Sequence, residues 1–295
     1  MSNPWDPIDV VHCGHERVVA VYLVETEDGI ALVDTGPAST LPALAEGLDA
    51  RGVAFADLSH ILLTHIHLDH AGAAGFIVRR HPHIQVHVSE IGAPHVIDPT
   101  NLERSARKVF GEEFDTLWGE LSPVPAENVH SVGGHVLGLD CFPSPGHAKH
   151  NVSYLDPTGT LYCGDAAGVR IEPGRHIRPV SPPPDIDLEA WLRTIDEIER
   201  RAPVRLALGH FGVKEDIADH LARLRGRIDL WSERVGGGMS REEFVALELA
   251  ELDAAGSGAE LQLYEWASQL DPCYLGLTRY WAKRREREAA DAVSA

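Results

Sequence analysis

Short apolar runs alternate with stretches of helical periodicity along most of the chain, and this order predicts an α/β protein. In the first half we expect strands at 18–25, 30–34, 61–64 and 85–88, and helices at 41–50 and 72–80. In the second half we expect strands at 136–142, 152–156, 161–164 and from 204 onward, with a helix at 188–200. Two half-domains of sheet with helices on their outer faces make an αββα sandwich, in which strand ends meet at one edge.

Three consecutive glycines at 236–238 predict a flexible joint. We therefore expect a main α/β domain at 1–235 and a helical C-terminal extension at 236–295. Helical patterns within the extension fall at 241–253, 261–270 and 273–287. Apolar residues in the last of these helices, such as Leu277 and Trp281, predict that it packs either on the main domain or on a second copy in a homodimer.

Length and composition indicate a globular protein with one large core. The chain has 295 residues, of which 44% are hydrophobic. Its formal net charge of −19 repels polyanions, so we expect no nucleic-acid partner. There is no apolar run of about 18 residues, and residues 1–6 lack the basic start and apolar core of a signal peptide. We therefore expect a soluble, cytoplasmic protein with no membrane partner.

The sequence HIHLDH at 65–70 places four metal-binding side chains directly after an apolar strand. On an extended backbone, residues i and i+2 project to the same side, so His65 and His67 can bind one ion. Asp69 and His70 come just before a run of small residues that lets the chain turn into a helix, so they can reach a second ion close by. This spacing indicates a metal site.

Three further candidate ligands recur downstream, each after a sharp turn or a predicted strand. His147 ends the loop SPGH and is a candidate third ligand to the first ion. Asp165 ends the strand pattern LYCGD, and the two oxygens of a carboxylate can bridge two cations. His210 follows an apolar strand and a glycine in ALGH. With the first cluster, these residues give seven ligands for two ions.

The order HIHLDH, SPGH, LYCGD and ALGH, preceded by IALVDTG at 30–36, resembles the metallo-β-lactamase fold superfamily over about residues 18–212. That superfamily includes glyoxalase II, lactonases and many other hydrolases. The resemblance implies one zinc on His65, His67 and His147, the other on Asp69, His70 and His210, and Asp165 as the bridge between them. It also implies that Asp34 lies outside the metal site and supports the ligand loop, the segment 65–70 that carries the first ligands. The run AKHN at 148–151 departs from the Pro-Gly-His step of many relatives, so the resemblance assigns no substrate.

For the domain at 1–235, the resemblance implies a dinuclear metal-dependent hydrolase. A metal-bridging hydroxide would cleave a small ester-type bond, such as a thioester or a lactone. Asp69 would orient the water and shuttle its proton, as the catalytic side chain. The histidine-rich ligand set favours two Zn²⁺ ions, with Fe or Mn as alternatives. The expected partner is a small-molecule substrate.

Two irregular segments are expected to shape the substrate site. The segment 92–129 contains a helical stretch at 102–118 and is either a lid or a packed surface insertion. The segment 168–184 begins three residues after Asp165. It carries Arg170, Arg175 and Arg178. Guanidinium groups match carboxylates, so these arginines are candidates to hold an anionic substrate; the alternative is that they are merely solvated.

Three other functions compete with the hydrolase. A mononuclear-iron sulfur dioxygenase shares the fold but uses fewer ligands. A flavodiiron protein would normally have Glu in place of His67 and carry a flavin domain. A non-catalytic metal-binding module would not need every ligand. The complete second set, with His70 and His210 included, favours the hydrolase.

Overall fold

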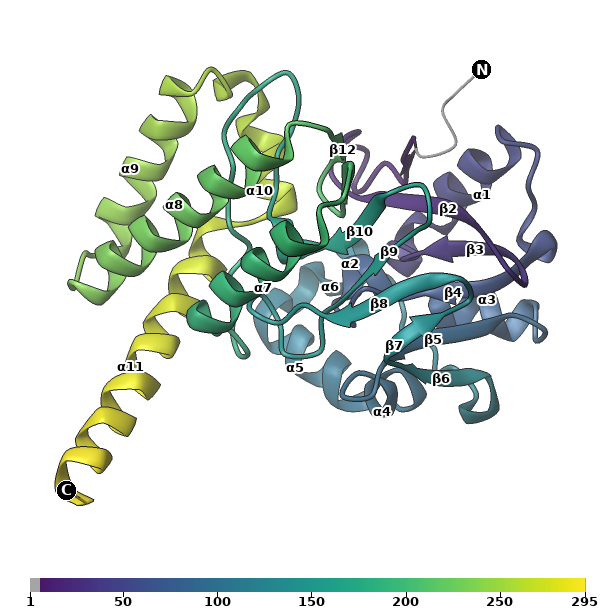
Figure 1. The fold of residues 1–295 in the computed structure, drawn as a ribbon, viewed down its shortest axis with the longest axis horizontal. Helices are drawn as coiled ribbons and strands as arrows, with labels where there is room; N and C mark the ends of the chain where they lie inside the picture. The colour runs from purple at the N-terminus through teal and green to yellow at the C-terminus, as the bar shows by residue number, and fades with distance from the viewer. Residues whose placement is uncertain (1–5, 295) are drawn as a thin grey trace.

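Two six-stranded β-sheets pack face to face, with helices on their outer sides (Figure 1). The protein was analysed as a computed structural model that describes residues 6–294. Residues 1–5, on which part of the expectation about a signal peptide rests, and residue 295 lie outside the described residues. The αββα sandwich expected from the sequence is confirmed.

The first sheet contains most of the parallel strand pairs. Its strands, in spatial order, are β1 Ile8–Asp9, β2 Ala20–Thr26, β3 Gly29–Val33, β4 Leu58–Leu62, β5 Gln85–Ser89 and β6 Val129–Val132. Strands β1 to β3 pair antiparallel, and β3 to β6 pair parallel. Parallel neighbours end at the same edge of a sheet, so Asp34 after β3 lies beside the ligand loop that follows β4.

The second sheet is mainly antiparallel. Its strands are β7 Gly134–Val136, β8 Leu139–Pro143, β9 Val152–Leu155, β10 Thr160–Gly164, β11 Arg205–Leu208 and β12 Gly212–Lys214. They lie in the order β12-β11-β10-β9-β8-β7, and β10 and β11 form the parallel pair. Asp165 and His210 follow the carboxyl ends of β10 and β11, so this pair brings them to one edge.

Helices cover the outer face of each sheet. Those of the first half are α1 Leu41–Asp49, α2 Leu68–Ala71, α3 Ala74–Arg80, α4 Ala93–Ile97, α5 Thr100–Phe110 and α6 Phe114–Leu117. Those of the second half are α7 Leu188–Arg201, α8 Ile217–Gly236, α9 Arg241–Ala254, α10 Leu261–Ala267 and α11 Leu270–Ser294. Leu44 of α1 and Ile77 of α3 pack on the first sheet, and Trp191 of α7 and Leu224 of α8 pack on the second.

Two buried tyrosines between the sheets join them close to the candidate ligands. The Tyr22 hydroxyl in β2 donates to the carbonyl of Leu208 at 2.7 Å, and the Tyr154 hydroxyl in β9 donates to the carbonyl of Leu63 at 2.9 Å. Leu63 and Leu208 each lie two residues before a candidate histidine ligand. Burying a hydroxyl is costly unless it is hydrogen-bonded, so these bonds fix how the two sheets meet at that edge.

Two expected elements differ from the structure. The single strand expected at 136–142 is a hairpin of β7 and β8, because Leu137 and Gly138 turn the chain with φ of 52° and 86°. The helical stretch expected at 102–118 is broken into α5 and α6 at Gly111, whose φ is 54°. The short strands β6 and β12 were not expected, and neither was the long helix α8.

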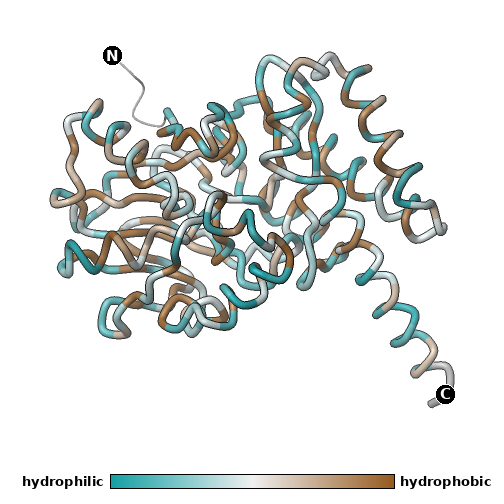
Figure 2. The backbone as a smooth tube through the Cα atoms, turned by 180° about the vertical axis from the view of Figure 1, so that it is seen from behind, coloured by the Kyte–Doolittle hydropathy of each residue, from teal (hydrophilic) through white to brown (hydrophobic). Residues whose placement is uncertain are grey.

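The C-terminal helices share a core with α8. Phe244 of α9 and Leu277 of α11 are buried in one apolar cluster with Trp231 of α8. The far end of α11 projects from the body and carries mostly hydrophilic residues (Figures 1 and 2). The expected division of the chain at residue 236 stays a prediction. Within residues 6–294, no helix is long and apolar enough to cross a membrane.

Candidate metal centre

The ligand loop leaves the end of β4 in an extended conformation and then forms a one-turn helix. His65 and His67 lie on the extended part, and Asp69 and His70 lie in α2. Two groups of side chains meet here, each with candidate ligand atoms within 4.8 Å of one another. The first group consists of His65, His67, His147 and Asp165, and the second of Asp69, His70 and His210. The structure therefore brings together all seven residues that the sequence selected.

The first group surrounds one point with three imidazoles and one carboxylate oxygen. Nε2 of His147 lies 2.8 Å from Nδ1 of His67. Oδ2 of Asp165 lies 3.4 Å from Nε2 of His147 and 3.9 Å from Nε2 of His65. These separations are close to those between neighbouring ligands around a tetrahedral ion, given metal–ligand distances of about 2.0–2.2 Å.

The second group lies on the other side of Asp165. Oδ2 of Asp69 is 3.3 Å from Nε2 of His210 and 3.6 Å from Nε2 of His70. Oδ1 of Asp165 is 3.4 Å from Nε2 of His210 and 3.3 Å from Nε2 of His70. One oxygen of Asp165 thus faces the first group and the other oxygen faces the second.

Asp34 holds ligands of both groups from behind. Its Oδ2 lies 2.8 Å from Nδ1 of His70 and accepts a 2.8 Å bond from the Thr64 hydroxyl, while its Oδ1 accepts the backbone N–H of Thr64 at 2.8 Å. Oγ1 of Thr64 lies 3.1 Å from Nδ1 of His65. A proton on Nδ1 leaves the Nε2 lone pair of each histidine free to bind a metal, and such outer partners fix the orientation of the ring.

Backbone carbonyls orient two more ligand histidines. Nδ1 of His147 donates to the carbonyl of Val180 at 2.6 Å, and Nδ1 of His210 donates to the carbonyl of Val18 at 2.6 Å. A carbonyl can only accept, so in both rings the proton is on Nδ1 and Nε2 faces the site. These contacts give the loop after Asp165 a role that the sequence did not reveal, since Val180 belongs to it.

Two glycines allow the ends of strands β10 and β11 to lie close to the ligand loop. A Cβ at Gly164, whose φ is 52°, would collide with the Thr64 side chain, and a Cβ at Gly209 would collide with the ring of His70. Each glycine directly precedes a ligand in the sequence. The glycine before each ligand is therefore a requirement of the site's packing.

Burial and charge together favour a cation. Burial and neighbouring imidazoles lower the pKa of His65 well below its ordinary value. Burial alone would lower the pKa of His70, but Asp69 and Asp165 raise it well above its ordinary value. Burial alone would raise the pKa of Asp165, but His210 and His70 hold it below its ordinary value. Neutral imidazoles and ionised carboxylates are the ligand forms that metals need, and binding would displace the proton from His70.

Several buried polar atoms in this space make no hydrogen bond within the described residues. They are Nε2 of His65, His70 and His210, and Oδ1 of Asp165. Buried polar groups without partners are costly, and these four atoms converge on the two groups just described. Two divalent cations would satisfy them, so the residues present suit a dinuclear centre.

The three arginines expected to hold a substrate anion lie in different settings. Arg170 binds both carboxylate oxygens of Asp216 at 2.8 Å. Arg178 is fully buried and donates to Glu265 at 2.7 Å. Arg175 is exposed. None of the three is among the candidate metal ligands, and their contact with a substrate stays a prediction.

His150 lies beside the first group and was noted in the sequence only as a departure from the family pattern. Its ring centroid is 5.4 Å from that of His67, and its Nδ1 is buried without a hydrogen bond in the described part of the chain. Its position three residues after His147 is the signal that could have identified it.

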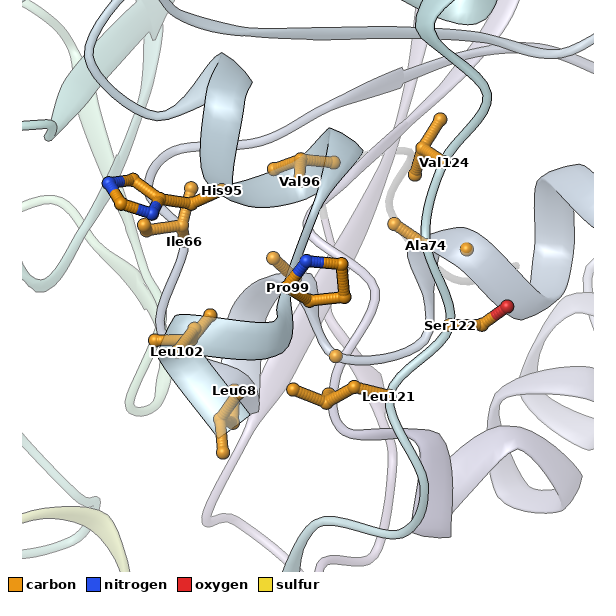
Figure 3. A pocket seen from close by; sticks show the side chains of 13 residues that line it. Ile66, Leu68, Ala74, His95, Val96, Pro99, Leu102, Leu121, Ser122 and Val124 are labelled. Carbon is orange, nitrogen blue, oxygen red and sulfur yellow. The ribbon is translucent and has the colours of Figure 1, made fainter. Parts of the chain in front are cut away.

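The insertion at 92–129 packs behind the ligand loop. Leu68, which alternates with the ligands in the loop, contacts Phe114 and Leu121 of the insertion in an apolar cluster. Next to it, Ile66, Leu68, His95 and Leu102 line a small pocket (Figure 3). In the loop, residues that face the metal groups thus alternate with residues that face the insertion. The insertion therefore supports the loop by packing against it.

The sandwich and the two adjoining ligand groups define an αββα protein with a candidate metal centre. The chain belongs to the Metallo-beta-lactamase superfamily, because the sequence profile of that family matches residues 15–210.

Similar proteins share this fold with little sequence identity. The uncharacterized protein YobT of Bacillus subtilis (strain 168) is 29% identical over 201 residues, which cover 65% of this chain and 82% of YobT. A hydroxyacylglutathione hydrolase of Aeromonas salmonicida (strain A449) is 26% identical over 145 residues, covering 49% of this chain and 45% of that enzyme. The crystal structure of ST1585 from Sulfolobus tokodaii superimposes with a TM-score of 0.64 at 21% identity, over 94% of this chain and 97% of ST1585.

Proposed function

We propose that this protein is a dinuclear metal-dependent hydrolase that cleaves a small ester-type bond, such as a thioester or a lactone. The observation that carries the proposal is the position of Asp165, whose Oδ2 faces the first ligand group and whose Oδ1 faces the second. A mononuclear-iron sulfur dioxygenase or a non-catalytic module would have no use for the complete second group. The two groups therefore favour the hydrolase.

Two bound divalent cations would lower the pKa of a shared water toward about 7 and polarise a carbonyl oxygen. The side chains then have distinct roles. Asp165 holds the two groups at a fixed separation, and Asp34 keeps His70 in the tautomer that binds metal. The side chain of Asp69 is 20% exposed, whereas those of His70 and Asp165 are almost fully buried, and this supports Asp69 as the residue that would orient the attacking water and hold its proton.

The ligand set and the comparisons support a metal and a substrate class. Five histidines and two carboxylates suit Zn²⁺, and Fe or Mn can occupy the same donors. The similarity to a hydroxyacylglutathione hydrolase covers about half of this chain and supports a thioester. The net charge of −19 supports a small-molecule substrate rather than a nucleic acid. We propose a cytoplasmic location for the enzyme.

The test combines metal analysis with a substrate panel. The purified protein, stripped with a chelator and reloaded with Zn²⁺, Fe²⁺ or Mn²⁺, is assayed on thioesters, lactones and phosphoesters. We expect two ions per chain and hydrolysis of a thioester or lactone that is lost on stripping. One iron per chain with oxygen-dependent sulfur oxidation would point to the dioxygenase, and two ions without hydrolysis of any ester would contradict the proposal.

A further inference from the structure

Four rings from distant parts of the sequence form an aromatic cluster, defined here as His12, His15, Trp118 and Trp266. His12 stacks on Trp118 with ring centroids 5.3 Å apart and meets Trp266 edge-on at 6.0 Å. His15 stacks on the other indole, Trp266, at 5.3 Å. The two histidines come from the loop between β1 and β2, Trp118 follows α6, and Trp266 lies in α10. Three separate segments therefore meet at this one place.

The backbone ties the histidine side of the cluster to the second ligand group. Val18 lies in the same loop, three residues after His15, and its carbonyl accepts the Nδ1 proton of His210 at 2.6 Å. The charges of two residues in this group also act on the His12 ring. Burial lowers its pKa to about 4, while the Asp69 carboxylate opposes that shift and His210 adds to it. These two influences indicate that the His12 ring lies near the second group.

The tryptophan side is tied to the same group. The carbonyl of Trp118 accepts the backbone N–H of Ser39 at 3.2 Å. Four residues before Ser39, the backbone N–H of Thr35 donates to the carbonyl of His70 at 2.6 Å. Both sides of the cluster are therefore joined by hydrogen bonds to segments that hold ligands of the second group.

The cluster has an unused hydrogen-bond donor and partly open rings. Nε1 of Trp118 is buried and makes no hydrogen bond to any described residue. The indoles of Trp118 and Trp266 are only half-buried. A buried donor without a partner is unfavourable, and a half-buried indole still has apolar surface to bury. A ligand with a flat ring would bury more of the indole surface. A hydrogen-bond acceptor on the same ligand would pair with Nε1 of Trp118.

We propose that the aromatic cluster is a substrate subsite that binds a flat aromatic group of the scissile ester or thioester, with Trp118 and Trp266 as specificity-determining residues. The inference rests on the proposed hydrolase function, which it deepens by naming the substrate class. Aromatic rings prefer offset-stacked or edge-to-face partners at centroid distances of about 4.5–7 Å, and the half-buried indoles offer such faces.

The experiment compares two pairs of N-acetylcysteamine thioesters in the zinc-loaded full-length protein. In the first pair, 3-phenylpropanoyl and butanoyl thioesters share a leaving group and have similar carbonyl reactivity. In the second pair, acetyl thioesters carry either an aromatic or an aliphatic thiol. We expect the aromatic member of at least one pair to have the higher kcat/KM. Trp118→Leu should reduce the ratio of aromatic to aliphatic kcat/KM by about tenfold, and Trp118→Phe should retain most of that ratio.

Trp281 provides a matched control. It is also a half-buried tryptophan whose Nε1 is buried without a hydrogen bond in the described residues, but it lies against Gly236 and Tyr280 instead of the rings of the aromatic cluster. Trp281→Leu should leave the aromatic preference unchanged. Circular dichroism and metal content equal to those of the wild type show that each variant is folded, so a lost preference reports on recognition.

The outcomes separate the subsite from the chemistry. No preference for an aromatic member in the wild type, or the same preference in Trp118→Leu and Trp266→Leu, would overturn the subsite while leaving the hydrolase intact. If neither pair is hydrolysed, the panel of thioesters, lactones and phosphoesters decides on the hydrolase, and calorimetric binding of 3-phenylpropanoate against butanoate decides on the subsite. Equal affinity for the two acids would then overturn it.

Discussion

The carboxylate of Asp34 lies 2.8 Å from Nδ1 of His70 and ties the residue after β3 to a ligand of the second metal group. The same carboxylate accepts two hydrogen bonds from Thr64, whose hydroxyl lies 3.1 Å from Nδ1 of His65. Asp34→Ala should therefore weaken metal binding by about 10–100-fold, as loss of an outer partner of a ligand histidine typically does. The effect should be larger for the second ion, because His70 loses its partner directly.

The measurement for Asp34→Ala is metal content after dialysis against chelators of increasing strength. Asp156→Ala is the control, because Asp156 is also a buried carboxylate but it bonds Thr158 and Thr160 in the turn before β10. This control should lose stability without a change in metal stoichiometry. Unaltered affinity for both ions in Asp34→Ala would show that the ligand loop holds its shape without this carboxylate.

Asp165→Ala should release both ions together. Each oxygen of Asp165 faces a different ligand group, so its loss removes one donor from each and the only carboxylate that the two groups share. His210→Gln is the matched comparison, because it removes a donor from the second group alone. We expect near-zero metal content and activity for Asp165→Ala, and about one ion per chain for His210→Gln. Two retained ions in Asp165→Ala would show that the bridging assignment is wrong.

The order of the metal ligands could be predicted because each stands where a local pattern ends. His65 follows an apolar strand, and Asp165 and His210 each follow a strand and a glycine, so their approximate positions need no knowledge of distant contacts. The glycines also indicate close approach. The expected layers of sheet and helix follow from the same periodicity.

Features that depend on contacts between distant segments could not be predicted from local sequence patterns. The turn that splits the expected strand at 136–142 uses Leu137 at positive φ, a conformation that its residue type does not favour. The loop after Asp165 was noted for its arginines, but the bond between the Val180 carbonyl and His147 joins residues 33 positions apart. Nothing local marks Val180, because any residue offers a carbonyl.

The ionised carboxylate of Glu251 should stabilise the folded protein, and its protonation should make the protein less stable in acid. Burial alone would raise the pKa of Glu251, but hydrogen bonds from Arg234 and Arg227 hold it at about 2, below its ordinary 4.5. A carboxyl with a lowered folded-state pKa adds stability above its unfolded pKa, and this stability is lost as the pH falls from about 4.5 toward 2. Glu251→Gln should lower the free energy of unfolding by about 1.5–3 kcal/mol at pH 7.

The measurement for Glu251 is denaturant unfolding of wild type and Glu251→Gln between pH 7 and pH 2. The difference between them should shrink below pH 4.5 and disappear near pH 2. Glu286→Gln, on the exposed end of α11, should behave as wild type throughout. A difference for Glu251→Gln that is constant with pH would mean that packing, rather than charge, is lost.

Removal of residues 237–295 should expose the core around α8. Phe244 and Leu277 are fully buried in one cluster with Trp231, so deletion would leave a large apolar surface on the main domain. We expect aggregation or lost activity, measured by size-exclusion chromatography and thioester hydrolysis. Removal of the residues after Arg287, which takes away the projecting end of α11, should have little effect. A monodisperse and fully active protein ending at residue 236 would show that the extension is an independent unit.

The loop arginines should separate into two classes on substitution. Arg178→Ala should destabilise the fold, by about 1.5–3 kcal/mol, because it leaves the buried Ser268 carbonyl without its charged donor and breaks the bond to the partly exposed Glu265. Arg170→Ala should likewise lose the paired contacts to Asp216. Arg175 is exposed, so Arg175→Ala should leave stability unchanged and can report on recognition alone.

The measurement for Arg175 is kcat/KM for an anionic thioester and its uncharged analogue. If Arg175 anchors the anion, Arg175→Ala loses about 1.5–3 kcal/mol of a charge-assisted contact, or roughly tenfold or more, on the charged substrate alone. Arg175→Lys should retain part of that preference, because the charge stays while the bidentate geometry is lost. Metal content should be the same in all three proteins, since Arg175 is not a ligand. Equal rates of wild type and Arg175→Ala on both substrates would place this arginine in solvent and exclude it from substrate recognition.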